Sequence, residues 1–313
     1  MFRNHFIISK SIHLGIFQVF GRKPPGKRRI FGIHWRLCFS SLCLDIWFME
    51  QDQVERIRVW FDEYTSRFFG DDEVVNAHLR LKQAHTARTC EEILLLVEQL
   101  GLDENQKRIA EVVALVHDVG RFPQFAEYRT FHDPKSVDHC ALGVAVLREQ
   151  GVLEGLAARE AQWVETAVAC HGRKVIPSGV TGPALLFSKL IRDADKIDIF
   201  RVVLENYRGY RENPDTFLLE IELPDEPGCS RDVLEAVLNG ELVDSRRLRT
   251  LNDMKLCQLG WVYDMNFTPA LQRLKELGFL DDIFECLPQT PDIARVREGI
   301  LIYIDARLAG DAK

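Results

Sequence analysis

Histidines and acidic residues in the middle of this chain have types and spacings that could hold a divalent metal ion. An adjacent pair, His117-Asp118, lies within the otherwise apolar phrase ALVHDVG. A buried histidine beside a buried aspartate is costly unless the two are paired or bound to metal. Neighbouring residues on a helix point about 100° apart, so both side chains can reach one ion beyond the helix end. Because imidazole suits transition metals and a carboxylate can bridge two ions, the pair predicts a metal site.

Other helical segments can each add one ligand to this site, and the candidates are His85, His139, His171 and Asp195. Two choices stay open on the residues alone. His78 lies one heptad before His85 and so on roughly the same helix face. Asp193 and Asp195 both have apolar neighbours at helical spacings, so periodicity does not separate them; Asp193 could instead orient a ligand histidine.

A second histidine-aspartate dipeptide, His132-Asp133, stands directly before Pro134. Because proline removes helical freedom from the residue before it, we interpret the dipeptide as part of a surface loop that lines the pocket. The phrase RFPQFAEYRTFHDPK, which contains Pro123 as well as Pro134, is predicted to be a loop over residues 121–135.

The elements that must position these side chains are predicted to be helices. Apolar residues at 109, 112, 113, 116 and 119 form a helical stripe that ends at Gly120. Ser136 is predicted to be the N-cap of the next helix, and Gly151 its C-terminal cap. Further helices are expected over residues 156–171, 183–207, 231–239, 252–265, 268–277 and 293–308. With no βαβ pattern, the chain is predicted to be all-α.

Composition narrows the function classes. The chain has 313 residues, 46% hydrophobic and 28% charged, with a net charge of -7, which argues against a stable nucleic-acid partner. No run of 18 apolar residues occurs, so no membrane span is expected. The eight cysteines include no CxxC pair, and we interpret them as reduced thiols of a cytoplasmic protein.

Residues 1–48 differ from the rest. They are aromatic-rich and hold eight basic side chains and one acid, leaving 32 basic and 46 acidic side chains after them. We predict that residues 1–48 are a disordered extension, a targeting or anion-binding arm, or a non-native upstream start. The favoured interpretation is the upstream start, because Met49 begins the helical phrase MEQDQVERIRVWFDEY. Residues 49–313 are then one helical domain.

The order histidine, His-Asp, histidine, histidine, aspartate resembles the HD-domain superfamily of metal-dependent phosphohydrolases, and the likeness covers residues 78–205. The phrases LVHDVGRFPQF, SVDHCALGVAVL and LIRDADKIDIF strengthen it. The resemblance implies an HD-type helical bundle with additional C-terminal helices. It chooses Asp195 over Asp193. It implies a first ion held by His85, His117, Asp118 and Asp195, and a second held by His139 and His171, with Asp118 as the bridge.

The resemblance also implies a reaction, in which a metal-bound water attacks phosphorus. Asp118 and Asp138 are the predicted catalytic acids, although Asp138 could equally be a helix N-terminal acid stabilised by the dipole. Arg121, Lys135 and Lys196 are the predicted phosphate contacts.

The expected function is a phosphomonoesterase or phosphodiesterase acting on a small phosphate ester, with a nucleotide favoured. It would use one or two divalent ions among Mn, Fe, Ni, Co, Zn and Mg. The alternatives are an HD-type di-iron oxygenase and a non-catalytic metal-binding sensor. The oligomeric state stays open, with a dimer allowed.

Overall fold

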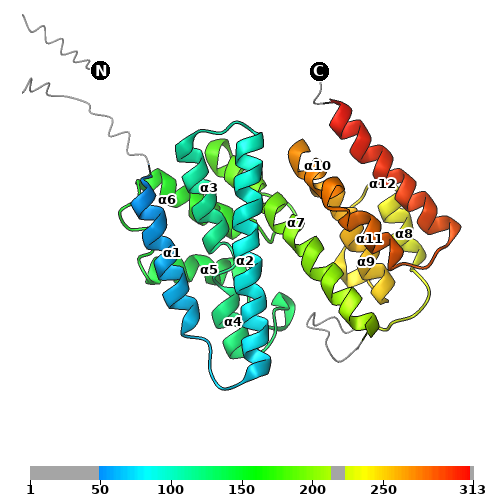
Figure 1. Ribbon diagram of the computed structural model, residues 1–313, viewed down its shortest axis with the longest axis horizontal. Coiled ribbons are helices and arrows are strands. Elements are labelled where there is room, and N and C mark those ends of the chain that lie inside the picture. The colour runs from blue at the N-terminus through cyan, green and yellow to red at the C-terminus, as the bar shows by residue number, and fades with distance from the viewer. Residues whose placement is uncertain (1–48, 213–222, 311–313) are drawn as a thin grey trace, which may run out of the picture. The chain divides into compact units, whose positions relative to one another are not determined.

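The computed structural model describes residues 49–212 and 223–310, which form helices joined by turns and loops (Figure 1). No strand occurs within these two ranges, so the predicted all-α class is confirmed. The predictions for residues 1–48 lie outside the described residues.

The first helices carry the predicted metal ligands. Asp72 accepts hydrogen bonds from the backbone N–H groups of Val74 and Val75, and Asp103 caps the following helix through Gln106. The helices are α1 (Gln51–Ser66), α2 (Glu73–Gln99), α3 (Glu104–Val116), α4 (Arg121–Tyr128), α5 (His139–Glu149), α6 (Ala158–Cys170) and α7 (Gly182–Glu212).

Two local predictions were wrong. Residues 121–128 form helix α4 although Pro123 lies within them, because the third residue of a helix has no intrahelical use for a backbone N–H. Helix α5 is capped by Asp138 and not by Ser136. The Asp138 carboxylate accepts from the backbone N–H groups of Cys140 and Ala141, at 2.9 and 3.0 Å.

The additional C-terminal helices follow residue 230. They are α8 (Arg231–Leu238), α9 (Leu251–Leu259), α10 (Thr268–Leu277), α11 (Phe279–Glu285) and α12 (Pro291–Gly310). Short 3₁₀ turns lie between some helices: η1 (Asp133–Lys135), η3 (Ser245–Arg247) and η4 (Gly260–Asp264). In the part of the chain that the structure describes, no helix is both long and apolar enough to cross a bilayer.

Helix α7 is buried on several sides, and this explains why its apolar residues are not confined to one face. It packs against α2, α3 and α6 and also against α10 and α11 (Figure 1). Phe187, Leu190, Ile197 and Phe200 have no exposed surface, and each such burial stabilises the fold by roughly 1.5–3 kcal/mol. Helix α7 therefore holds its acidic residues in fixed positions between the two sets of helices.

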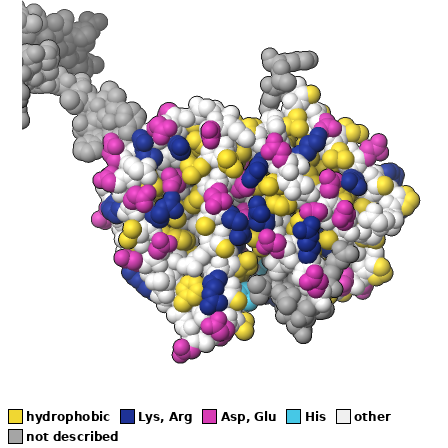
Figure 2. Space-filling model, in the orientation of Figure 1, with side chains coloured by type: hydrophobic (Ala, Val, Ile, Leu, Met, Phe, Trp, Pro, Cys, Tyr) yellow, Lys and Arg dark blue, Asp and Glu magenta, His cyan; other side chains and the backbone are white. Residues whose placement is uncertain are grey.

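On the face drawn in Figure 2, positive and negative side chains are interspersed among apolar ones, without a continuous basic surface. Histidine surface is visible there only as a small spot in a hollow. The histidines that could do chemistry are accordingly found inside the fold, where His85, His117, His139 and His171 are each at most 5% exposed.

Candidate metal centre

The His117-Asp118 pair lies where α3 ends and the chain turns into α4. His117 is the C-cap of α3, and its Nδ1 donates to the carbonyl oxygen of Ala114 at 2.7 Å. This bond leaves Nε2 as the open ring nitrogen facing the other histidines. Asp118 follows in the turn and is 3% exposed.

The turn approaches α5 very closely, which requires a glycine. A Cβ atom placed on Gly120 would lie 2.6 Å from the backbone nitrogen of Gly143 and closer still to the carbonyl oxygen of His139. Real Cβ atoms essentially never approach backbone so closely. Gly120 therefore lets α5 bring His139 up to Asp118.

The first cluster of ligand atoms joins α2, the end of α3 and α7. His85 Nε2 lies 3.0 Å from Asp195 Oδ1 and 3.3 Å from His117 Nε2. His117 Nε2 lies 3.7 Å from the same oxygen of Asp195 and 3.7 Å from Asp118 Oδ2. His85, His117 and Asp195 thus offer three ligand atoms within 4.8 Å of one another.

The second cluster joins the start of α5 to the end of α6. His139 Nε2 lies 3.1 Å from His171 Nε2, and the two nitrogens lie 3.6 and 3.4 Å from Asp118 Oδ1. His171 Nδ1 donates to the carbonyl oxygen of Val168 at 2.8 Å, so its Nε2 is also the open nitrogen. Asp118 presents one oxygen to each cluster. The structure therefore brings together all six predicted ligand residues; their assignment as ligands stays a prediction.

The structure places His78 and Asp193, the alternatives to His85 and Asp195, away from the two clusters. His78 lies outside both clusters: its Nδ1 bonds the Val74 carbonyl oxygen at 2.8 Å, and its ring stacks on Phe125 at 4.6 Å. Asp193 points to the C-terminal helices, where it accepts from the backbone N–H groups of Asn266 and Phe267, each at 2.9 Å. Asp193 does not orient a ligand histidine.

The acid that orients His85 is Asp198, whereas the sequence analysis considered Asp193 for such a role. Its Oδ2 accepts from His85 Nδ1 at 2.7 Å, and Arg88 forms a two-point ion pair with its carboxylate at 2.5 and 3.0 Å. Asp198 stands three residues after Asp195, on the same face of α7. That i, i+3 spacing was the available signal.

Asp133 has the matching position behind His139. Its Oδ2 lies 2.6 Å from His139 Nδ1, and its other oxygen accepts from Arg121 Nη1 at 2.8 Å and from Gln124 Nε2 at 2.9 Å. The second dipeptide was interpreted as a surface loop that lines the pocket, and the contact of Asp133 with His139 was not predicted. His132 is exposed and lines the cavity described below.

Electrostatics favour the metal-binding protonation state at Asp118, Asp195 and His117, but not at His85 and His171, whose pKa values are raised. Burial would raise the pKa of Asp118, but Lys82 and His117 outweigh it and hold that pKa well below its usual range. His117 and His85 do the same for Asp195 against its burial. Burial lowers the pKa of His117, which favours the neutral imidazole that binds metal. The pKa of His171 is raised, because Asp118 and Cys140 outweigh its burial.

The predicted phosphate contacts lie in three different settings. Arg121 lines the cavity but is engaged by Asp133 and by the carbonyl oxygen of Phe131, and its Nε lies 3.5 Å from Asp118 Oδ1. Lys196 forms an ion pair with Asp264 at 2.8 Å. Lys135 is exposed in η1 and does not line the cavity.

Lys82 is a cation that the sequence analysis did not select. Its Nζ lies 2.8 Å from Asp118 Oδ2, and its side chain is 17% exposed. It stands one helical turn before His85 on α2, so that both side chains face the site.

The predicted catalytic Asp138 is held as the α5 cap, with its carboxylate near Asp133 and His139.

A cavity of about 780 Å³ opens beside the first cluster. Its charged and polar lining includes Lys82, His85 and Arg121, and also Lys174, Asp244 and Arg246. Apolar surface comes from Ile199 and Val203 on α7 and from Val243, Met254 and Trp261 in the C-terminal region. A molecule in this cavity would therefore meet a candidate metal ligand, charged side chains and apolar surface.

A family model described as "HD domain" matches residues 83–199. No curated protein and no solved structure matches the chain. The matched residues run from just before His85 to just after Asp198, so they include both clusters and the two acids that orient His85 and His139.

Proposed function

Because the chain carries an HD domain, we propose that it is a metal-dependent phosphohydrolase acting on a small phosphate ester, with a nucleotide as the favoured substrate. The observation that carries the proposal is the convergence of four buried histidines and two carboxylates from separate helices around Asp118. The family at large consists of metal-dependent hydrolases, and the candidate ligand groups suit a divalent ion.

The donor set fits a divalent metal. With metal–nitrogen bonds of about 2.0–2.1 Å, tetrahedral ligand atoms stand roughly 3.3 Å apart. The nitrogen–nitrogen distances of 3.3 Å in the first cluster and 3.1 Å in the second lie close to that value. Without a cation, such buried acceptors and lone pairs would face one another at a cost. His85, His117, Asp118 and Asp195 would hold one ion, and His139 and His171, with Asp118, the other.

Divalent ions bound at these residues would supply Lewis-acid stabilisation and a water molecule acidified toward neutral pH. The chain itself supplies the remaining parts. Lys82 places a positive charge where the cavity meets Asp118, and it can donate to a phosphate oxygen. Asp198 and Asp133 fix the rings of His85 and His139 through their Nδ1 atoms.

The cavity supports a substrate the size of a nucleotide. A volume of about 780 Å³ falls within the usual range for small-molecule sites. Trp261 and Phe131 line it, and each offers an aromatic surface to a planar group. A phosphate bound by Lys82 would leave the organic part to the apolar lining residues of the same cavity.

A cytoplasmic location belongs to the same proposal. Six cysteines within the described residues are free thiols, as expected in a reducing compartment. Cys38 and Cys43 lie outside those residues.

The test is a metal-reconstitution screen on the full chain. Metal-free protein is loaded separately with Mn, Fe, Co, Ni, Zn or Mg and offered phosphate monoesters, nucleoside triphosphates and cyclic nucleotides. We expect metal-dependent release of phosphate or of a nucleoside monophosphate. His117→Ala and Asp118→Ala should abolish it, and His78→Ala, which removes a buried histidine outside the clusters, should retain it.

Full activity in both the His117 and the Asp118 variants would overturn the proposal. Oxygen consumption by an iron-loaded protein that releases no phosphate would point to the oxygenase. A protein with no affinity for any of these ions would support the sensor.

A further inference from the structure

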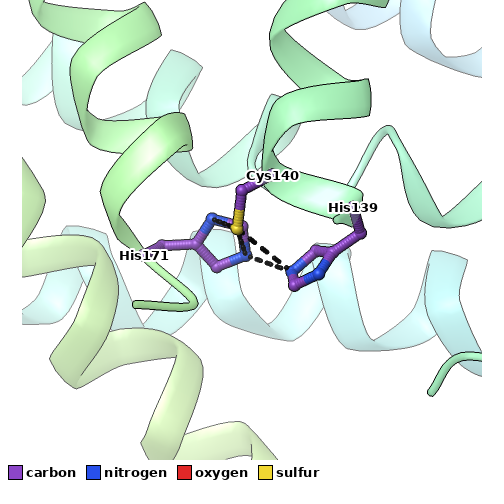
Figure 3. Close-up of side chains that lie close together, drawn as sticks. All are labelled: His139, Cys140 and His171. Carbon is purple, nitrogen blue, oxygen red and sulfur yellow. Dashed lines mark hydrogen bonds between the residues drawn. The ribbon is translucent and has the colours of Figure 1, made fainter. Parts of the chain in front are cut away.

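Cys140 lies directly against the two histidines of the second cluster. It follows His139 in the first turn of α5, and its side chain is buried with those of His139 and His171 (Figure 3). Its Sγ lies 3.4 Å from His139 Nε2, and it lies 3.5 Å from Nδ1 and 4.0 Å from Nε2 of His171. The three residues form a group whose ligand atoms all lie within 4.8 Å of one another.

These separations suit a metal site that includes sulfur. Metal–sulfur bonds of about 2.3 Å and metal–nitrogen bonds of about 2.0–2.1 Å give tetrahedral edges of roughly 3.6 Å for S···N and 3.3 Å for N···N. The structure has S···N distances of 3.4 and 4.0 Å and an N···N distance of 3.1 Å. Each edge needs an adjustment of only a few tenths of an ångström.

The opposite wall of this cluster is a glycine. A Cβ atom placed on Gly172 would lie 2.9 Å from Cys140 Sγ and 3.0 Å from His139 Cε1. Gly172 follows His171 directly at the end of α6. Its lack of a side chain therefore lets the end of α6 approach the sulfur and the His139 ring closely.

We propose that Cys140 binds the second metal ion as a thiolate, together with His139 and His171. The inference rests on the proposed metal centre and adds to its ligand set. On binding, the thiol releases its proton to solvent and the sulfur donates an electron pair to the ion. A thiolate with two imidazoles favours borderline or soft ions such as Zn²⁺ and Co²⁺ over Mg²⁺ and Mn²⁺. The second position would therefore prefer borderline or soft ions, whereas the first position has no sulfur ligand and would not share this preference.

Cobalt spectroscopy on the full chain tests the proposal without relying on activity. Metal-free protein is titrated with Co²⁺, and the thiolate-to-cobalt charge-transfer absorption in the near ultraviolet is recorded with the number of ions bound. The wild-type protein should develop this band with the second equivalent. Cys140→Ser should lack the band and bind the second ion at least about tenfold more weakly, while its first equivalent binds as before.

Cys90→Ser is the matched control. Cys90 is also a buried thiol, and it lies in the middle of α2 outside the clusters of candidate ligands. This variant should show the wild-type band and stoichiometry, and circular dichroism should show that both variants keep the helical fold.

Three results would overturn the proposal: two bound cobalt ions without a charge-transfer band in the wild type, the same spectrum in Cys140→Ser, or loss of the band in Cys90→Ser. The first two leave the metal centre itself in place, so they are distinguishable from a failure of the proposed function. That failure would appear as no cobalt bound at either position.

Discussion

Two buried aspartates on α7, five residues apart, allow metal affinity to be separated from fold stability. Asp198 holds His85 through Nδ1, whereas Asp193 holds the chain at Asn266 and Phe267. We predict that Asp198→Asn lowers the affinity for the first metal ion by about 10–100-fold, because the His85 ring loses the charged acceptor that orients it. This range corresponds to about 1.4–2.8 kcal/mol of binding free energy.

Asp193→Asn is the matched control, since it removes the same charge from the same helix. The substitution replaces one carboxylate oxygen of Asp193 with an amide group. In the wild type the Oδ2 atom accepts hydrogen bonds from the backbone N–H groups of both Asn266 and Phe267. We expect it to lower the free energy of unfolding by about 1–3 kcal/mol. Its metal affinity should stay within about twofold of wild type, because Asp193 is not among the candidate ligands and makes its contacts away from them.

Calorimetric titration of metal-free protein with Zn²⁺ or Co²⁺ measures the affinities, and urea unfolding of the metal-free protein measures the stabilities. The reasoning is refuted if Asp198→Asn binds the first ion as tightly as wild type. It is also refuted if Asp193→Asn loses as much affinity as Asp198→Asn, because the effect would then follow from loosening α7.

Three further predictions concern the surroundings of the site. Lys82→Met should lower kcat/KM for a phosphate ester by about 10–100-fold, since a charge-assisted hydrogen bond is worth about 1.5–3 kcal/mol. Metal titration of the same variant should show that its affinity for the ions does not fall. Gly120→Ala should cost about 1–3 kcal/mol or more in urea unfolding, and Gly70→Ala, whose Cβ would meet nothing within 4 Å, should stay within about 0.5 kcal/mol of wild type. Burial would raise the pKa of Asp133, but His139 and Arg121 lower it from 3.8 to about 2, so its stabilising contribution is complete above pH 3.8 and is lost as the pH falls through about 2. In metal-free protein, Asp133→Asn should therefore be about 1 kcal/mol less stable than wild type at pH 7, after allowance for solvent screening. This difference should become small as the pH falls to about 2 and vanish below it, and a difference that stays undiminished at pH 2 would contradict this assignment.

Much of the fold and the centre of the site could be predicted from the sequence. The apolar stripe before His117 and the glycines after several helices are local signals, and they predicted helices that the structure contains. The order of histidines and acids indicated which residues would meet. The capping of α5 by Asp138 and not Ser136 was missed, because both residue types cap helices well and only the backbone geometry separates them.

The residues behind the histidines could not be predicted in the same way. Asp193 and Asp198 are both acids on a helix whose buried residues are spread over several sides, so periodicity gives neither of them a preferred face. What separates them is the partner that arrives from elsewhere in the chain: Arg88 on α2 for Asp198, and the backbone at residues 266–267 for Asp193. Those contacts join residues more than 70 positions apart, and no local pattern encodes them.

The same argument explains why Lys82 was not selected, why the contact of Asp133 with His139 was not predicted, and why both residues matter. Each takes its role from Asp118 or His139, which lie on other elements, and each was locally an ordinary surface charge. The buried carboxylate of Asp118 nevertheless requires cationic neighbours, since burial alone opposes its charge. A metal ion and Lys82 can both meet that requirement. Ions bound at the candidate ligands would share in meeting it, and the positive charge of Lys82 would then be available to an anion in the cavity, as the proposed hydrolysis of a phosphate ester needs.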